Sequence, residues 1–256
     1  VLHQSGIDEW GSVDLLAELV ERSLVAVAEG DAPRYRLLET GRAYALEKLV
    51  QAGELGALRQ RHAHALRELF ETAWDACWVL PEAEFVARYE PELDNLRAAL
   101  DWAALHEPQT AIALAGASAR LWRWLSLHPE ALRRCAAARA LLDAATPPAL
   151  AARLWEAIAQ LSGEISSAES RPAAKNALSL YEQLGDARGR YLALGHIAFS
   201  YRATAPEAEA AYAAMQALED PRWPPAVRLS GTKVAGGLAS DAGRIEQARA
   251  AHEARL

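Results

Sequence analysis

The chain has 256 residues, of which 52% are hydrophobic and 24% are charged, a composition that indicates a folded globular protein and excludes a disordered one. Its formal net charge of −7 disfavours a surface built to neutralise the phosphates of a nucleic acid. No apolar run approaches the about 20 residues of a membrane-spanning helix, and no stretch resembles a secretory signal, so we expect a cytoplasmic protein with no membrane partner.

Two further features of the composition concern the cell compartment and the extent of the chain. Cys77 and Cys135 lie far apart without a partner motif, so buried free thiols are expected, which also favours the cytoplasm. The sole methionine is Met215, the chain starts at Val1 without a helix cap, and it stops at Leu256 inside a helical pattern. We therefore expect a piece of a longer protein.

The first section, residues 1–53, is predicted to be the C-terminal part of a winged-helix domain. Ser12 can cap its first helix, and Gly53 suits the left-handed residue that ends its second. Between the two helices, strand-like segments flank a turn and predict a β-ribbon. The predicted elements are a helix over 12–21, a strand over 23–28, a turn over 29–33, a strand over 34–37 and a helix ending at Gly53.

A helical adaptor is predicted over residues 54–106. The helical period continues without a break from Glu54 to about Leu80. Pro81 and Pro91 then stand where the first turn of a new helix tolerates proline. No internal repeat is visible in this section.

The last section, residues 107–256, is predicted to form helix hairpins. Two pairs of equivalent residues, Tyr181 with Met215 and Leu184 with Leu218, are offset by 34 residues, which is the tetratricopeptide period. The predicted fold class is therefore mainly α, a partial winged helix with a β-ribbon followed by a tetratricopeptide-like α-solenoid. The helices are expected near 109–127, 129–144, 149–163, 172–184, 187–203, 206–219, 225–240 and 243–256.

Five motifs occur in a recognisable order. They are RYRLLETGRAYALEKL at 34–49, GE at 53–54, RQRHA at 59–63, ELDNLRAALDWA at 92–103 and LGDARGRYLALGHIA at 184–198. Together they resemble bacterial STAND-class regulators, the signal-transducing NTPases that include LuxR- and SARP-type transcriptional regulators. The resemblance implies an NTPase core followed by a winged helix, a helical linker and tetratricopeptide-like repeats.

The resemblance also implies partners and a cofactor. In that family, ATP exchange and an inducer convert a closed monomer into an active homo-oligomer, and a separate domain binds DNA. The expected partners are thus the protein's own NTPase domain and a small-molecule or protein inducer. This stretch has no G-x-x-x-x-G-K-[ST] loop, so ATP or ADP is expected in the NTPase domain and no cofactor is expected here.

One candidate site lies at the junction between the second strand and the next helix. Related winged helices carry a Met-His-Asp motif whose histidine reads bound ADP, and the comparable place here is residues 37–39, with Leu38 at the histidine position. Glu39, Thr40 and Arg42 remain as polar candidates for contact with the NTPase core and for nucleotide sensing. The alternative interpretation makes them ordinary residues of a strand–helix junction.

A second candidate site is the groove formed by the first helices of successive hairpins. Aromatic and basic side chains in such a groove can hold a peptide or an effector, although Trp residues also fill gaps in poorly packed repeats. Two tryptophans that are two residues apart on a helix cannot both point inward. The groove candidates are Trp122, Trp124, Trp155, Arg153, Arg190 and His196.

Catalytic, metal-binding and DNA-binding roles are disfavoured. The sequence has no G-x-S-x-G or H-E-x-x-H motif, and His62 and His64 would point about 200° apart on a helix. Asp14, Glu18 and Glu21 would repel phosphate from the helix before the ribbon. The predicted function is a non-catalytic regulatory arm of a STAND-type transcriptional regulator; the alternative is a free-standing tetratricopeptide adaptor.

Overall fold

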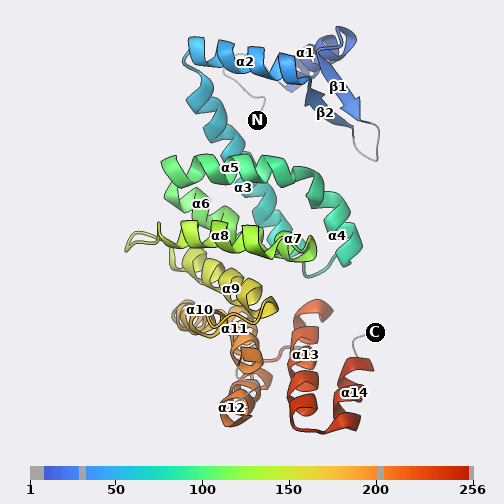
Figure 1. Ribbon diagram of the computed structural model, residues 1–256, viewed down its shortest axis with the longest axis vertical. Helices are drawn as coiled ribbons and strands as arrows, with labels where there is room; N and C mark the ends of the chain where they lie inside the picture. The colour runs from blue at the N-terminus through green and yellow to red at the C-terminus, as the bar shows by residue number, and fades with distance from the viewer. Residues whose placement is uncertain (1–8, 29–32, 201–204, 254–256) are drawn as a thin grey trace. The chain divides into compact units, whose positions relative to one another are not determined.

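The computed structural model describes residues 9–28, 33–200 and 205–253 (Figure 1). The chain divides into two compact units, an N-terminal unit of residues 1–65 and a C-terminal unit of residues 66–256. The structure is mainly helical with one small antiparallel sheet, as the sequence predicts. In the described part of the chain, every helix is too short or too polar to cross a membrane.

The N-terminal unit contains the predicted helix, ribbon and helix. The strands pair antiparallel, with Val25 opposite Leu37 and Ala28 opposite Arg34. Ser12 lies inside the first helix, which begins three residues before the predicted cap, and most of the predicted turn falls outside the described residues. The elements are α1 (Glu9–Glu21), β1 (Val25–Ala28), β2 (Arg34–Leu37), α2 (Glu39–Gln51) and the start of α3 (Leu55–Ala76).

Gly53 ends α2 as predicted. Its φ of 71° places it in the left-handed region, where glycine has no steric penalty. The Gly53 N–H donates to the carbonyl of Val50 at 3.1 Å, and the Glu54 N–H donates to the carbonyl of Leu49 at 2.9 Å. This pair of bonds satisfies the last carbonyls of the helix.

The C-terminal unit begins with an aromatic core. The Phe85 ring centroid lies 4.6 Å from that of Tyr89, which lies 6.2 Å from that of Phe70. All three side chains are buried, and the two free cysteines, Cys77 and Cys135, are buried as expected. The helices after α3 are α4 (Glu82–Tyr89), the 3-10 helix η1 (Glu90–Glu92) and α5 (Leu93–His106).

Packed helices occupy the rest of the unit. Neighbouring helices from α9 to α14 contact each other in sequence, and α6 and α11 also pack on α9. The helices are α6 (Pro108–Ala117), α7 (Ala119–Trp124), α8 (His128–Arg139), α9 (Pro148–Glu164), α10 (Ser170–Leu184), α11 (Ala187–Ser200), α12 (Ala205–Gln216), α13 (Pro225–Asp241) and α14 (Ile245–Glu253).

Two predicted helix boundaries are wrong. The helix expected over 109–127 is two helices that meet at Ser118, whose hydroxyl donates to the Leu114 carbonyl at 2.7 Å and accepts from Trp122 Nε1 at 2.9 Å. Such side-chain bonds compete with a regular helix. The helix expected over 129–144 ends at Arg139, and in the turn that follows it Asp143 Oδ1 accepts from the Ala145 N–H at 3.0 Å.

Glycine allows close approach between several helices. A Cβ on Gly116 of α6 would lie 3.1 Å from the Leu154 backbone nitrogen of α9. A Cβ on Gly189 of α11 would lie 2.3 Å from the Tyr181 ring of α10. These contacts bring α6 against α9 and α11 against α10, and so help to position the polar side chains that project from α9 and α11.

Candidate functional site

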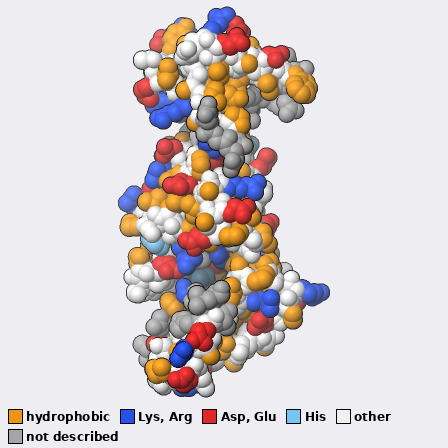
Figure 2. Space-filling view, turned by 90° about the vertical axis from the view of Figure 1, so that its right-hand side faces the viewer, with side chains coloured by type: hydrophobic (Ala, Val, Ile, Leu, Met, Phe, Trp, Pro, Cys, Tyr) orange, Lys and Arg blue, Asp and Glu red, His pale blue; other side chains and the backbone are white. Residues whose placement is uncertain are grey.

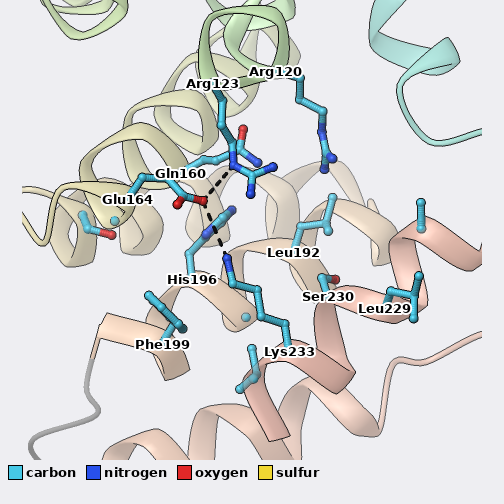
Figure 3. Close-up of a pocket in the computed structure, with 15 residues that line it drawn as sticks. Arg120, Arg123, Gln160, Glu164, Leu192, His196, Phe199, Leu229, Ser230 and Lys233 are labelled. Atoms are coloured by element: carbon cyan, nitrogen blue, oxygen red, sulfur yellow. Dashed lines mark hydrogen bonds and ion pairs between the residues drawn. The ribbon is translucent and has the colours of Figure 1, made fainter. Parts of the chain in front are cut away.

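A hollow of about 180 Å³ lies in the C-terminal unit among α7, α9, α11 and α13 (Figure 3). Among the described residues that line it, Arg120, Arg123 and Lys233 are permanent cations, whereas Glu164 is the sole carboxylate. The other lining residues are Gln160, Gly163, Ser170, Leu192, Gly195, His196, Phe199, Ala226, Leu229, Ser230 and Val234.

Helical spacing explains why these side chains share one hollow. Residues three or four apart lie on the same face of a helix. Gln160 and Glu164 are four apart on α9, and Leu192 and His196 are four apart on α11. Arg120 and Arg123 project from the short helix α7 with a spacing of three, so each helix contributes side chains from one face of its surface.

Glu164 is the centre of an ion-pair network in the hollow. Arg123 Nε donates to Glu164 Oε1 at 2.7 Å, and Lys233 Nζ lies 3.6 Å from the same oxygen. Burial opposes the ionised form, but the hydrogen bond from Arg123 and the charges of Arg123 and Lys233 outweigh it and lower the pKa of Glu164. Glu164 is also the last residue of α9, where the helix dipole disfavours an anion.

Arg120 differs from Arg123 because no described carboxylate forms an ion pair with it, although the charge of Glu156 acts on it. Its guanidinium carbon lies 3.6 Å from the ring centroid of Trp78, and among the described residues no carboxylate oxygen lies within 4 Å of its nitrogens. Burial lowers the pKa of Arg120, which nevertheless stays protonated at neutral pH. The hollow therefore contains a cation whose charge is not neutralised by an ion pair.

His196 is held neutral at physiological pH. Burial is the main cause that lowers its pKa to about 4, and the positive charges of Arg120, Lys233 and Arg123 lower it further. A neutral imidazole has one donor and one acceptor nitrogen. His196 can thus exchange hydrogen bonds with a bound molecule without adding a charge.

A buried carboxylate lies on the same helix as Glu164. Glu156 is 4% exposed, and the Tyr181 hydroxyl donates to its Oε2 at 2.6 Å. Burial raises the pKa of Glu156, against the lowering effects of Tyr181 and of Arg120, Arg188 and Arg153. Sequence reasoning missed Glu156, although its apolar neighbours Trp155, Ala157 and Ile158 were a visible signal of burial.

The candidates at the strand–helix junction lie in the N-terminal unit. Glu39, Thr40 and Arg42 are all exposed, and Arg42 Nη2 lies 2.8 Å from Glu39 Oε1 within the first turn of α2. The hydrogen bond from Arg42 lowers the pKa of Glu39. Leu38, at the N-cap, makes no side-chain capping bond.

The structure does not bring the three tryptophan candidates into the hollow. Trp122 is 1% exposed and donates to Ser118, so it is a core residue and not a groove anchor. Trp124 is partly exposed against Phe85, with ring centroids 4.8 Å apart. Trp155 packs against the buried alanines and Tyr181 at the α9–α10 contact. As expected, the two tryptophans of α7 do not share one environment.

Of the polar groove candidates, His196 lines the hollow. Arg153 lies over the Trp74 ring at 4.9 Å from its centroid, and Arg190 is partly buried on α11 outside the lining. Sequence reasoning missed the roles of Arg123, Glu164 and Lys233. Nothing in the residues around each of them indicates that charged side chains from three separate helices meet in one hollow. In the described part of the chain, no cluster of three or more His, Cys, Asp or Glu could hold a metal ion.

Comparison with known proteins gives a partial match. No protein-family model matches the chain. Over 103 residues the chain is 42% identical to proteins named "Putative HTH-type transcriptional regulator" from Mycobacterium bovis and from two strains of Mycobacterium tuberculosis. The matched segment covers 38% of this chain and 11% of each relative. The chain thus spans about a tenth of the length of these curated relatives, to which it is similar over part of its sequence.

Proposed function

We propose that the chain is the non-catalytic regulatory arm of a larger transcriptional regulator and that the hollow is its effector site. The similarity to proteins named as HTH-type transcriptional regulators supports the regulatory role. The hollow supplies the observation that carries the effector role. Among the described lining residues, three cations face one carboxylate there, in a chain whose formal net charge is −7. A concave site with convergent polar groups is typical of ligand binding.

The finer proposal is a STAND-type mechanism, supported by the motifs at 34–49 and 92–103. The longer protein contains an NTPase domain that binds ATP or ADP and a separate domain that binds DNA. Without effector, the arm holds the NTPase domain in a closed monomer. An effector that prefers the open arrangement shifts the population towards an active homo-oligomer.

Exposed apolar side chains support a protein partner for the N-terminal unit. Figure 2 shows hydrophobic side chains at the surface of this unit, and large apolar surfaces of this kind mark protein contacts. The NTPase domain is the proposed partner, and Glu39, Thr40 and Arg42 lie at the start of α2, next to exposed Leu37 and Leu38. The exposed residues are Trp10, Val13, Leu15, Leu19, Leu24, Val27, Tyr35, Leu37, Leu38, Tyr44 and Val50.

A reporter assay with the longer regulator tests this function. Removal of residues 66–256 should raise effector-independent transcription several-fold, because the closed state loses its restraint. The double substitution Arg123→Met with Lys233→Met should remove the response to the natural effector in cells. Arg249→Met, at an exposed ion pair on α14, is the matched control. Unchanged transcription in both the deletion and the double variant would overturn the proposal and favour the adaptor alternative.

A further inference from the structure

Two cations in the hollow share one carboxylate oxygen. Arg123 comes from α7, Lys233 from α13 and Glu164 from the end of α9. The oxygen that accepts from Arg123 Nε at 2.7 Å also lies 3.6 Å from Lys233 Nζ (Figure 3). A single carboxylate therefore serves two cations, and a charge-assisted bond to a second anion could replace it at either one.

The third cation is available to a ligand. Arg120 reaches from α7 towards Leu192, beside Arg123, and lines the hollow (Figure 3). One face of its guanidinium is covered by Trp78, which leaves its planar N–H edge to bind a carboxylate or a phosphate. Burial lowers the pKa of Arg120 and the charge of Glu156 raises it, but no described carboxylate forms an ion pair with Arg120 within 4 Å. An anion in the hollow would therefore gain this contact without breaking an ion pair.

Part of the remaining wall of the hollow is apolar, beside the polar side chains of Gln160, Ser170, His196 and Ser230. Leu192, Phe199, Leu229 and Val234 contribute apolar side chains to it. Lys233 Nζ lies 5.1 Å from the centroid of the Phe199 ring, so the cationic and apolar parts of the wall adjoin each other. A molecule that carries an anionic group on a short apolar body matches both parts.

We propose that the hollow binds a small organic anion, whose carboxylate or phosphate group replaces Glu164 as the partner of Arg123 and Lys233 and also contacts Arg120. Its apolar body packs against Phe199 and Leu192. Glu164 then acts as an internal competitor that fills the site when the ligand is absent. The inference rests on the proposal that the hollow is the effector site, but its chemistry is tested separately.

If Glu164 competes with the bound anion, neutralising its side chain should strengthen anion binding. Glu164 carries a negative charge next to the position of the bound anion and at a helix C-terminus that already disfavours it. Glu164→Gln removes the repulsion and the competition together, so anion affinity should rise. If Glu164 instead received a cationic ligand, the same substitution would weaken binding.

Calorimetry on the 256-residue chain tests the inference with benzoate, phenyl phosphate and uncharged benzyl alcohol. We expect saturable binding of at least one anion with a dissociation constant on the order of 1 mM and none of benzyl alcohol. Binding of benzoate, of phenyl phosphate or of both identifies the preferred anionic group. Arg123→Met should weaken binding about tenfold, and Glu164→Gln should strengthen it several-fold. Arg249→Met and Glu253→Gln alter the exposed pair on α14 and should leave binding unchanged.

Nuclear magnetic resonance of His196 provides a second readout, which does not depend on the heat of binding that calorimetry measures. An added anion close to the imidazole should raise its pKa from about 4. Arg123→Lys, which retains the charge, controls for misfolding and should keep part of the affinity. Failure of both anions to bind, equal binding of benzyl alcohol, or weaker binding by Glu164→Gln would each overturn the inference.

The two proposals can fail independently. If the anions bind but neither the pocket variants nor the deletion changes reporter output, the anion site stands and the regulatory function fails. If the anions do not bind but the pocket variants abolish the cellular response, the regulatory function stands and the anion inference fails.

Discussion

The two units bury their apolar side chains to different extents. In the C-terminal unit, Trp78, Tyr89 and Trp122 are at most 2% exposed. In the N-terminal unit, by contrast, Trp10 is 78% exposed and Tyr44 is 63% exposed. The helix α2 contains no buried residue at all.

This difference shows that a helix can form even where its apolar side chains are not buried. The apolar residues of α1 and α2 follow a helical period, yet the described residues provide little against which to bury them. Burial contributes about 25 cal/mol for each Å² of apolar surface removed from water. The N-terminal unit therefore leaves stabilisation unrealised that a partner surface would supply, whereas the C-terminal unit supplies its own core.

Replacement of one tryptophan in each unit should show the largest contrast. Trp122→Ala removes a buried ring and its bond to Ser118 and should cost about 3–5 kcal/mol of unfolding free energy. Trp10→Ala removes an exposed ring and should change it by less than about 0.5 kcal/mol. Urea denaturation followed by circular dichroism measures both. Equal losses would contradict the difference in burial.

A methyl group added to a glycine should change the free energy of unfolding in opposite directions in the two units. Gly189→Ala places a Cβ 2.3 Å from the Tyr181 ring and should destabilise the C-terminal unit by about 1–3 kcal/mol. Gly56→Ala adds a Cβ with no atom within 4 Å in α3 and should stabilise the helix by up to about 1 kcal/mol. Thermal melts of the two variants give the signs, and a stabilising Gly189→Ala would show that α10 and α11 are not so closely packed.

The buried pair of Glu156 and Tyr181 has no counterpart among the described side chains of α2, which are exposed or partly exposed. Tyr181→Phe removes the hydroxyl that donates to Glu156 at 2.6 Å and should cost about 1–3 kcal/mol. A second substitution, Glu156→Leu, should recover part of the loss, because the orphaned carboxylate is removed. A double-mutant cycle by denaturation measures the coupling, and strictly additive losses would refute it.

Acid should weaken the C-terminal unit through His196. Its pKa is about 4 in the folded chain and about 6.5 when unfolded, so the unfolded chain binds more protons between these values. The contribution of His196 to the free energy of unfolding is thus constant above about pH 6.5 and is lost as the pH falls towards 4. His196→Gln should flatten this part of the curve. Glu130, whose pKa is about 2, causes loss only below its ordinary value of 4.5, which separates the two effects.

The smallest contrast between the two units is expected for serines in left-handed conformation. Ser166 after α9 has φ 55°, and Ser23 after α1 has φ 56°. Glycine accepts this conformation without strain, so Ser166→Gly and Ser23→Gly should each stabilise by about 0.5–1 kcal/mol. A similar gain in both units would show that helix ends are local features, independent of the core. Differential scanning calorimetry provides the measurement.

Much of the fold was predictable because its signals are local. The strand at 34–37 was predicted with the bounds that the structure has, and Gly53 ends α2 in the expected conformation. Ser23, Ser126 and Ser166 adopt the same left-handed backbone, but serine does not mark this position in a sequence. The break at Ser118 was equally hidden, because it depends on a hydroxyl bonded to Trp122.

The sequence by itself determined which segments become helices and strands, because hydrophobic period, proline and glycine act over a few neighbouring residues. Only the tertiary structure decided which polar groups meet. Arg123 and Glu164 are separated by 41 residues, and Lys233 comes from a further helix. Their convergence depends on how closely α7, α9, α11 and α13 pack, which is set by side-chain shape and glycine contacts across the whole unit.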